Sequence, residues 1–132
     1  MKEILNEVLD EIKSALEDSQ GMVAHQRRLA FSLSLGAVTL IEGYLRKLNV
    51  FKSGSKINHL WLKKKKENAK KILERYITTP VERLEHLDQI LELAYQIEKE
   101  RNELAYGKPV SEIMLRHQIN SFFKLKELIE NV

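Results

Sequence analysis

The sequence predicts an all-α protein, folded as an up-and-down bundle of four to five helices. Only two prolines and five glycines interrupt its 132 residues, fewer breaks than a fold of short strands and turns requires. Apolar side chains recur every three or four residues along most of the chain, which is the spacing of one face of a helix. With 43% hydrophobic residues the chain can bury an ordinary core, and residues 1–132 are expected to form a single domain.

Composition also excludes several classes of protein. Without cysteine the chain forms neither a disulfide framework nor a thiolate metal site. No uncharged apolar run is long enough to cross a membrane, and residues 1–13 place acids inside their apolar pattern, unlike a signal peptide. We therefore expect a cytoplasmic protein with no membrane partner. No two of the four histidines are three or four residues apart, so neither a metal site nor a cofactor is predicted.

The N-terminal part of the chain contains two predicted helices. Residues 2–18 carry apolar side chains on one face and charged side chains on the other, which indicates an amphipathic helix. Residues 1–20 are expected at the periphery, where this helix packs across the bundle or mediates dimerisation. Residues 22–49 are the most apolar stretch and predict a central helix covered on several sides. One side of this helix carries the small residues Ser32, Gly36 and Gly43. They favour close packing of another helix, and the alternative is a ligand groove.

The middle of the chain combines a loop with a strongly basic helix. Residues 50–56 contain Ser-Gly-Ser and predict the loop. Residues 57–77 then predict one continuous helix with an apolar edge. Residues 46–76 carry eleven lysines and arginines against two acids. Such a block attracts polyanions, because bound counterions are released when it neutralises phosphates.

Two long helices complete the predicted bundle. Thr79 is predicted as an N-cap, with a proline after it and Glu82 completing a capping box. The helix that begins there is expected to cover residues 80–106, and Gly107 is predicted as its C-terminal cap. Residues 111–130 repeat the helical apolar spacing and predict the last helix.

The basic part of the 57–77 segment is a candidate nucleic-acid-binding surface. Basic side chains beside an aromatic ring suit contacts with a nucleic-acid backbone combined with base stacking. The candidate binding residues are Trp61, Lys63, Lys64, Lys66, Lys70 and Lys71. On a continuous helix Lys63, Lys66 and Lys70 would share one strip, with the other two lysines on a neighbouring strip. The alternative is a solvated helix face with Trp61 in the core.

Arg101 occupies a position that the apolar stripe of the 80–106 helix assigns to a core residue, between Ile97 and Leu104. A guanidinium in that position must be paired with an acid or must face a cleft, because an unpaired buried charge is costly. The sequence leaves two interpretations open. Arg101 is either part of a binding site or a helix-end arginine that pairs with Glu98, Glu42 or another acid.

Asn102 and Tyr106 are four residues apart and therefore share a helix face beside Arg101. An arginine, an amide and a phenol close together can hold a phosphate through charge-assisted hydrogen bonds. The alternative is that Asn102 is solvated and Tyr106 packs in the last turn of the helix. The stretch Arg-Asn-Glu-Leu-Ala-Tyr resembles the R-x4-H type motif of the HEPN superfamily. The segment His25–Val50 is similar to the long apolar core helix of those small bundles.

The resemblance implies a HEPN-like bundle, usually a homodimer, in which the motif of both protomers lines one cleft. Many members are metal-independent ribonucleases, and several are toxins paired with a nucleotidyltransferase antitoxin. Others are non-catalytic RNA-binding or scaffold domains. The resemblance would make Arg101 the residue that binds the scissile phosphate and Asn102 an orienting residue. The family's histidine corresponds to Tyr106, and a tyrosine donates a proton but is a poor base near neutral pH.

Two functions from different classes remain after these observations. The first is an RNA-associated protein with metal-independent or degenerate ribonuclease activity, whose site consists of Arg101, Asn102 and Tyr106. The second is a non-catalytic interaction or scaffold module, or the partner of a nucleotidyltransferase antitoxin. A histidine for the first function could also come from His117 in the last helix, if the fold brings it near the motif.

Overall fold

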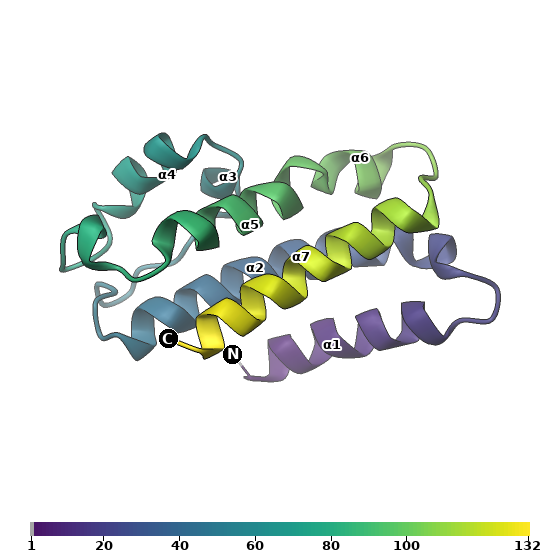
Figure 1. Ribbon diagram of the computed structural model, residues 1–132, viewed down its shortest axis with the longest axis horizontal. Helices are drawn as coiled ribbons and strands as arrows, with labels where there is room; N and C mark the ends of the chain where they lie inside the picture. Colours follow the sequence, from purple (N-terminus) through teal and green to yellow (C-terminus); the bar gives the residue numbers. More distant parts are fainter. Residues whose placement is uncertain (1) are drawn as a thin grey trace.

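The predicted all-α fold is confirmed by the computed structural model, which describes residues 2–132 (Figure 1). The α-helices are α1 Lys2–Glu17, α2 Gln26–Lys47, α3 His59–Leu62, α4 Lys66–Leu73, α5 Leu87–Lys99, α6 Arg101–Tyr106 and α7 Glu112–Glu130, with short 3₁₀ turns at Met22–His25 and Val81–Arg83. In Figure 1, α1 and the consecutive pair α5–α6 run in one direction along the molecule, and α2 and α7 run in the other. The two short helices α3 and α4 pack against α5.

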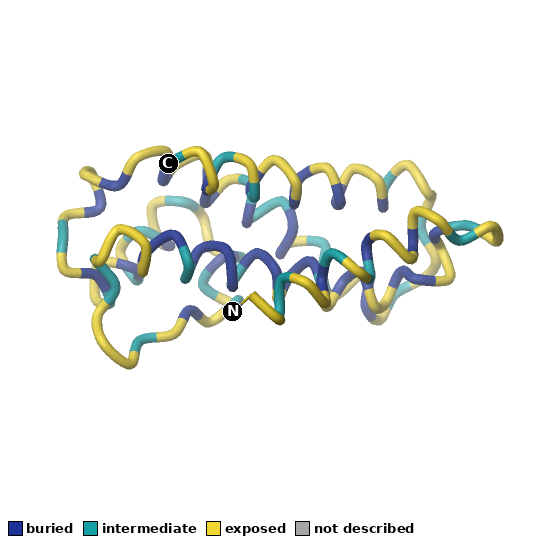
Figure 2. Tube along the Cα trace, turned by 90° about the horizontal axis from the view of Figure 1, so that it is seen from below, coloured by how far each residue is buried: buried dark blue, intermediate teal, exposed yellow. Residues whose placement is uncertain are grey.

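Helix α2 is the centre of the bundle, as its apolar sequence predicts. Helices α1, α5, α6 and α7 all pack against it. Figure 2 shows the same arrangement, with buried residues on the inner sides of the long helices and exposed residues on the outer sides. Two large apolar side chains of α2 stay outside this core, because Phe31 and Leu35 are 40% and 46% exposed. They are available to line a surface pocket.

Residues Met22–Lys47 also have the length and composition of a membrane-spanning helix, with a mean hydropathy of 1.2 over their most apolar window. In the bundle, 61% of that window is buried. A central helix covered on several sides needs the same apolar composition as a membrane span. The contacts of α2 within the bundle therefore account for its apolar sequence.

Close packing at the predicted small residues is confirmed at Gly36. A Cβ atom built on Gly36 would lie 2.5 Å from Cε1 of Phe122 in α7 and 3.1 Å from Cγ1 of Val8 in α1. Phe122 is itself fully buried, so it has no space into which to retreat. Glycine is therefore required where α1, α2 and α7 meet.

The first helix belongs to the core rather than to the periphery. Val8, Ile12 and Ala15 of α1 are fully buried against α2. A polar cluster then fixes the turn into α2, where His25 Nε2 lies 2.8 Å from Asp18 Oδ2. The pKa of Asp18 is held below its ordinary value, first by the hydrogen bond from the backbone N–H of Gln20 and second by the hydrogen bond with His25. The N-terminal helix thus packs along α2 as part of the bundle, instead of lying across it.

The continuous helix predicted over residues 57–77 is wrong. Helix α3 ends at Leu62, and α4 begins only at Lys66. The break has two physical reasons. A helix through the lysine run would place Lys63 and Lys66 one turn apart, with no acid between them. The break also folds α4 back toward α5, so that Leu62, Ala69 and Leu73 are all buried.

The single helix predicted over residues 80–106 is also wrong. The residues after Pro80 form only a short 3₁₀ turn, with no side-chain cap, so the predicted capping box is absent there. His86 has a left-handed backbone (φ 62°), and α5 starts after it. The hydroxyl of the buried Tyr44 donates a hydrogen bond to the backbone carbonyl of Glu85 at 2.6 Å. In a continuous helix that carbonyl would instead accept from a backbone N–H of the next turn. Burial raises the pKa of Tyr44 above its ordinary value.

The two C-terminal predictions are confirmed. Gly107 ends α6, and its N–H donates to the carbonyl of Glu103. Its backbone is extended, and glycine is needed because a Cβ atom would lie 2.5 Å from the oxygen of that carbonyl. Helix α7 spans Glu112–Glu130, and the hydroxyl of Ser111 caps it by accepting from the N–H of Met114 at 3.2 Å.

Candidate functional site

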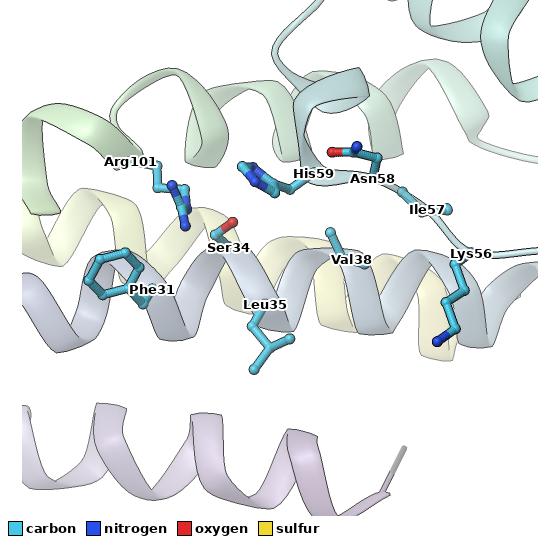
Figure 3. A pocket seen from close by; sticks show the side chains of 9 residues that line it. All are labelled: Phe31, Ser34, Leu35, Val38, Lys56, Ile57, Asn58, His59 and Arg101. Atoms are coloured by element: carbon cyan, nitrogen blue, oxygen red, sulfur yellow. The ribbon is translucent and has the colours of Figure 1, made fainter.

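A pocket of about 600 Å³ opens between α2 and the segments that carry α3 and α6 (Figure 3). Its walls are mostly apolar, with a few polar groups, and its size is within the usual range of ligand-binding clefts. The residues that line it are Phe31, Ser34, Leu35, Val38, Lys56, Ile57, Asn58, His59 and Arg101. The pocket therefore contains the arginine of the predicted site together with residues from three other segments.

Arg101 begins α6, directly after the helix breaks at Glu100. Its guanidinium carbon lies 5.0 Å from the centre of the Phe31 ring, a cation–π contact, and Nη1 donates to Asn102 Oδ1 at 3.2 Å. Its Nε is buried and has no hydrogen-bond partner within residues 2–132. A buried donor left without a partner costs about 1–3 kcal/mol.

The alternative in which Arg101 pairs with an acid is wrong for the two acids considered. Glu42 accepts from the N–H of Ile57 at 2.6 Å and pairs with Arg46 at 3.6 Å. Glu98 bonds to other groups of the pocket, described below. Across the described part of the chain, no carboxylate forms an ion pair with Arg101. The guanidinium therefore carries a positive charge at the pocket that no carboxylate of residues 2–132 neutralises by an ion pair.

Glu98 is a fully buried carboxylate behind the pocket wall, and its role was missed by the sequence interpretation. Its Oε1 accepts from the Ser34 hydroxyl at 2.5 Å, and its Oε2 lies 3.2 Å from Nδ1 of His59. The carboxylate thus joins α5 to α2 and α3. A signal was present, because Glu98 is four residues after Ala94 on the buried stripe of α5, and a charge there requires partners.

His59 presents its imidazole to the pocket, with its side chain 35% exposed. In Figure 3 its ring lies between Arg101 and Asn58, above Ser34 of α2. Asn58 caps α3 by accepting from the N–H of Leu60 at 2.9 Å, and Glu42 holds the preceding residue Ile57. Because a carboxylate accepts hydrogen bonds, Glu98 favours a proton on Nδ1 and leaves Nε2 as the free acceptor.

The three predicted motif residues are only partly brought together. Asn102 is exposed and bonds to Arg101. Tyr106 is 71% exposed and does not line the pocket, but its ring meets the edge of Phe31 with the ring centres 5.9 Å apart. Phe31 thus contacts both Arg101 and Tyr106 at the rim. His117 is exposed on α7 and is not part of the pocket wall.

The segment that follows the motif is held by Gln26, a buried glutamine at the start of α2. Its Nε2 donates to the carbonyls of Leu104 at 3.1 Å and Lys108 at 3.0 Å, and its Oε1 accepts from the N–H of Val110 at 2.9 Å. These three bonds fix the end of α6 against α2. They keep the helix that carries Arg101 beside the pocket.

The predicted strip of lysines does not form on one helix. Trp61 is half-buried and stacks on Tyr76, with the ring centres 4.7 Å apart, so one face of the indole is covered. Its packing agrees with the alternative in which Trp61 belongs to the core. Lys63 and Lys64 lie in the turn after α3, whereas Lys66, Lys70 and Lys71 belong to α4.

Lys66 and Lys70 are partly neutralised by Asp88 at the start of α5. Lys66 Nζ is 3.8 Å from Asp88 Oδ2, and Lys70 binds the other oxygen. The pKa of Asp88 is held below its ordinary 3.8, mainly by the Lys70 ammonium and to a smaller extent by that of Lys66. Asp88 in turn raises the pKa of Lys70 above its ordinary 10.5. Of the five candidate binding lysines, the exposed ones without this neutralisation are Lys64 and Lys71.

The Lys70–Asp88 pair predicts a specific dependence of stability on pH. The contribution of Asp88 is present above about pH 3.8 and is lost as the pH falls through its lowered pKa. The contribution of Lys70 is present below about pH 10.5 and is lost as the pH rises through its raised pKa. Thermal unfolding of Asp88→Asn should therefore differ most from the wild type near neutral pH. A difference that stays constant in strong acid and strong base would contradict the pairing.

Within residues 2–132 no three histidine, aspartate or glutamate side chains are placed to share a metal ion. Comparison with protein-family models, with curated proteins and with solved structures gave no match. The functional proposal therefore depends on the residues that form the pocket.

Proposed function

We propose that the protein binds single-stranded RNA and that Arg101 holds a backbone phosphate in the pocket beside α2. The observation that carries this proposal is that Arg101 lines the pocket and has no acid paired with it in the described chain. Arginine is the side chain best suited to bind phosphate, because its donors match two oxygens at once.

The surroundings of Arg101 favour a nucleic-acid ligand over a small anion. Lys56 lines the opposite end of the pocket and adds a second positive charge, as Figure 3 shows. Phe31, Leu35 and Val38 supply apolar surface in the same pocket, suited to a base or a sugar. A pocket of about 600 Å³ can take an unstacked nucleotide but not a duplex. Single-stranded RNA meets these three conditions.

The resemblance to the HEPN superfamily extends this proposal to a homodimer that is a metal-independent ribonuclease or a degenerate form of one. Arg101, Asn102 and the aromatic rim formed by Phe31 and Tyr106 are contiguous, which supports a shared site. The wild-type protein should therefore bind RNA at a surface that includes α6.

The binding proposal is tested with a labelled mixed-sequence single-stranded RNA, by fluorescence anisotropy at fixed salt. Arg101→Gln should weaken binding about 10- to 100-fold, because a charge-assisted hydrogen bond contributes about 1.5–3 kcal/mol. Arg116→Gln is the matched control, since Arg116 is an exposed arginine of α7 that pairs with Glu112 outside the pocket. It removes the same charge and should change affinity less than about threefold. Equal losses in the two variants would show that RNA recognises overall charge rather than this pocket.

A second candidate is the non-catalytic module that is the partner of a nucleotidyltransferase. The observation that favours it is the 71% exposure of Tyr106, whose ring makes a T-shaped contact with Phe31. A partner enzyme could reach the Tyr106 hydroxyl without entering the pocket. Mass spectrometry of the protein co-expressed with a nucleotidyltransferase would show a nucleotide adduct on Tyr106. An unmodified Tyr106 would remove this candidate.

A further inference from the structure

We infer that His59, oriented by Glu98, is the proton-transfer residue of the pocket and that it catalyses cleavage of the bound RNA strand. The inference rests on the proposed function, because Arg101 must first hold the phosphate. It assigns the proton transfer to a histidine from α3, outside the Arg101–Tyr106 segment.

The Glu98 carboxylate is bonded on both oxygens and is 0% exposed. Ser34 fixes one oxygen from α2, and His59 binds the other from α3. Burial of a carboxylate is costly, and an apolar residue would fill the same space without that cost. The arrangement instead fixes the orientation of one imidazole, as a carboxylate does for the histidine of many acid–base sites.

The imidazole of His59 is partly exposed and lines the pocket that also contains Arg101. Nδ1 of His59 is bonded to Glu98, so its other nitrogen, Nε2, is the atom available to a ligand. His59 and Arg101 line the same pocket, and in Figure 3 the ring and the guanidinium are both drawn on the side of the pocket opposite Ser34 of α2. A phosphate held by Arg101 would therefore lie next to a base. Tyr106 does not line this pocket.

The reaction requires only the RNA strand, one base and water. Nε2 of His59 takes the proton of the ribose 2′-hydroxyl, and the 2′ oxygen attacks the phosphorus atom of the adjacent phosphodiester. A bond forms between the 2′ oxygen and phosphorus, and the bond from phosphorus to the 5′ oxygen of the next nucleotide breaks. That oxygen takes a proton from water at the open mouth of the pocket. The products are a 2′,3′-cyclic phosphate and a 5′-hydroxyl, and His59 later returns its proton to solvent.

Each residue then has a separate task in this step. Arg101 offsets the negative charge that develops on the phosphate oxygens. His59 moves the proton, an effect that typically accelerates a reaction about 10²–10⁴-fold. Glu98 is a positioning residue, because it contacts His59 and not the RNA. Ser34 holds Glu98 in turn.

The inference is tested by measuring affinity and cleavage separately, on the full chain and in the presence of a chelator. The probes are a labelled single-stranded RNA and its 2′-O-methyl analogue, which can be bound but lacks the attacking hydroxyl. Wild-type protein should bind both and cleave only the first, leaving a 2′,3′-cyclic phosphate. His59→Asn should bind RNA within about threefold of the wild type and cleave it at least about 100-fold more slowly.

Two further variants separate catalysis from a structural effect. His59→Ala should recover part of its cleavage rate when free imidazole is added, which a purely structural role of His59 would not allow. Glu98→Gln, which preserves the shape of the side chain, should lower kcat about 10- to 100-fold and leave KM nearly unchanged. Circular dichroism should give all three variants the helical content of the wild type.

The outcomes distinguish this inference from the proposed function. Wild-type protein that binds RNA through Arg101 but cleaves none of it would overturn the inference and leave the binding proposal standing. Cleavage that continues at the wild-type rate in His59→Asn would also overturn it. Absence of RNA binding by the wild type would overturn both proposals.

Discussion

Replacement of Phe122 by alanine is expected to lower the free energy of unfolding by about 3–5 kcal/mol, the usual cost of removing a buried phenylalanine. Phe122 is fully buried in α7 and is the side chain that meets Gly36 where α1, α2 and α7 join. Removing the ring leaves a cavity that three packed helices cannot close. Urea denaturation followed by circular dichroism measures the change.

The adjacent residue is the matched control. Phe123 has the same side chain on the same helix but is 39% exposed. Phe123→Ala should cost about 1 kcal/mol or less, because much of the ring is already in water. A similar loss in both variants would mean that the junction at Gly36 is not the tightly packed point of the bundle.

Replacement of Gln26 by alanine is expected to lower the free energy of unfolding by about 3 kcal/mol, since each of its three hydrogen bonds contributes about 1 kcal/mol. The loss should also be local, because the bonds hold the end of α6 and the residues after it. Hydrogen exchange at the amide of Val110 should become faster in the variant than in the wild type.

Gln89→Ala is the control for Gln26, since Gln89 is exposed on α5. It should change stability by no more than about 0.5 kcal/mol. RNA binding offers a second readout, because loosening α6 also moves Arg101. If Gln26→Ala left both the exchange of Val110 and the affinity for RNA unchanged, the glutamine would not hold the helix of the site in place.

The arrangement of the long helices could be predicted from the sequence because each has a continuous apolar stripe. The periodicity of residues 2–18, 22–49 and 111–130 was sufficient to predict α1, α2 and α7. The breaks in the other two predicted helices could not be found in this way, because they depend on tertiary contacts. One is the bond from the Tyr44 hydroxyl to the carbonyl of Glu85.

The candidate site was predictable only in part, for a similar reason. Arg101 interrupts an apolar stripe, which is visible in the sequence and led to the correct expectation that it pairs with an acid or faces a cleft. His59 and Glu98 are 39 residues apart, and only the fold brings them together. No spacing rule along one helix connects them.

The central claim is that RNA enters the pocket between α2 and α6, and a nuclear magnetic resonance titration tests it most directly. A short single-stranded RNA is added to labelled protein, and the Nε–H of Arg101 and the imidazole of His59 are observed. If RNA enters the pocket, the signals of Arg101, His59 and Phe31 should shift together and saturate at the same RNA concentration. Shifts confined to the exposed lysines Lys64 and Lys71, with Arg101 and His59 unchanged, would contradict it.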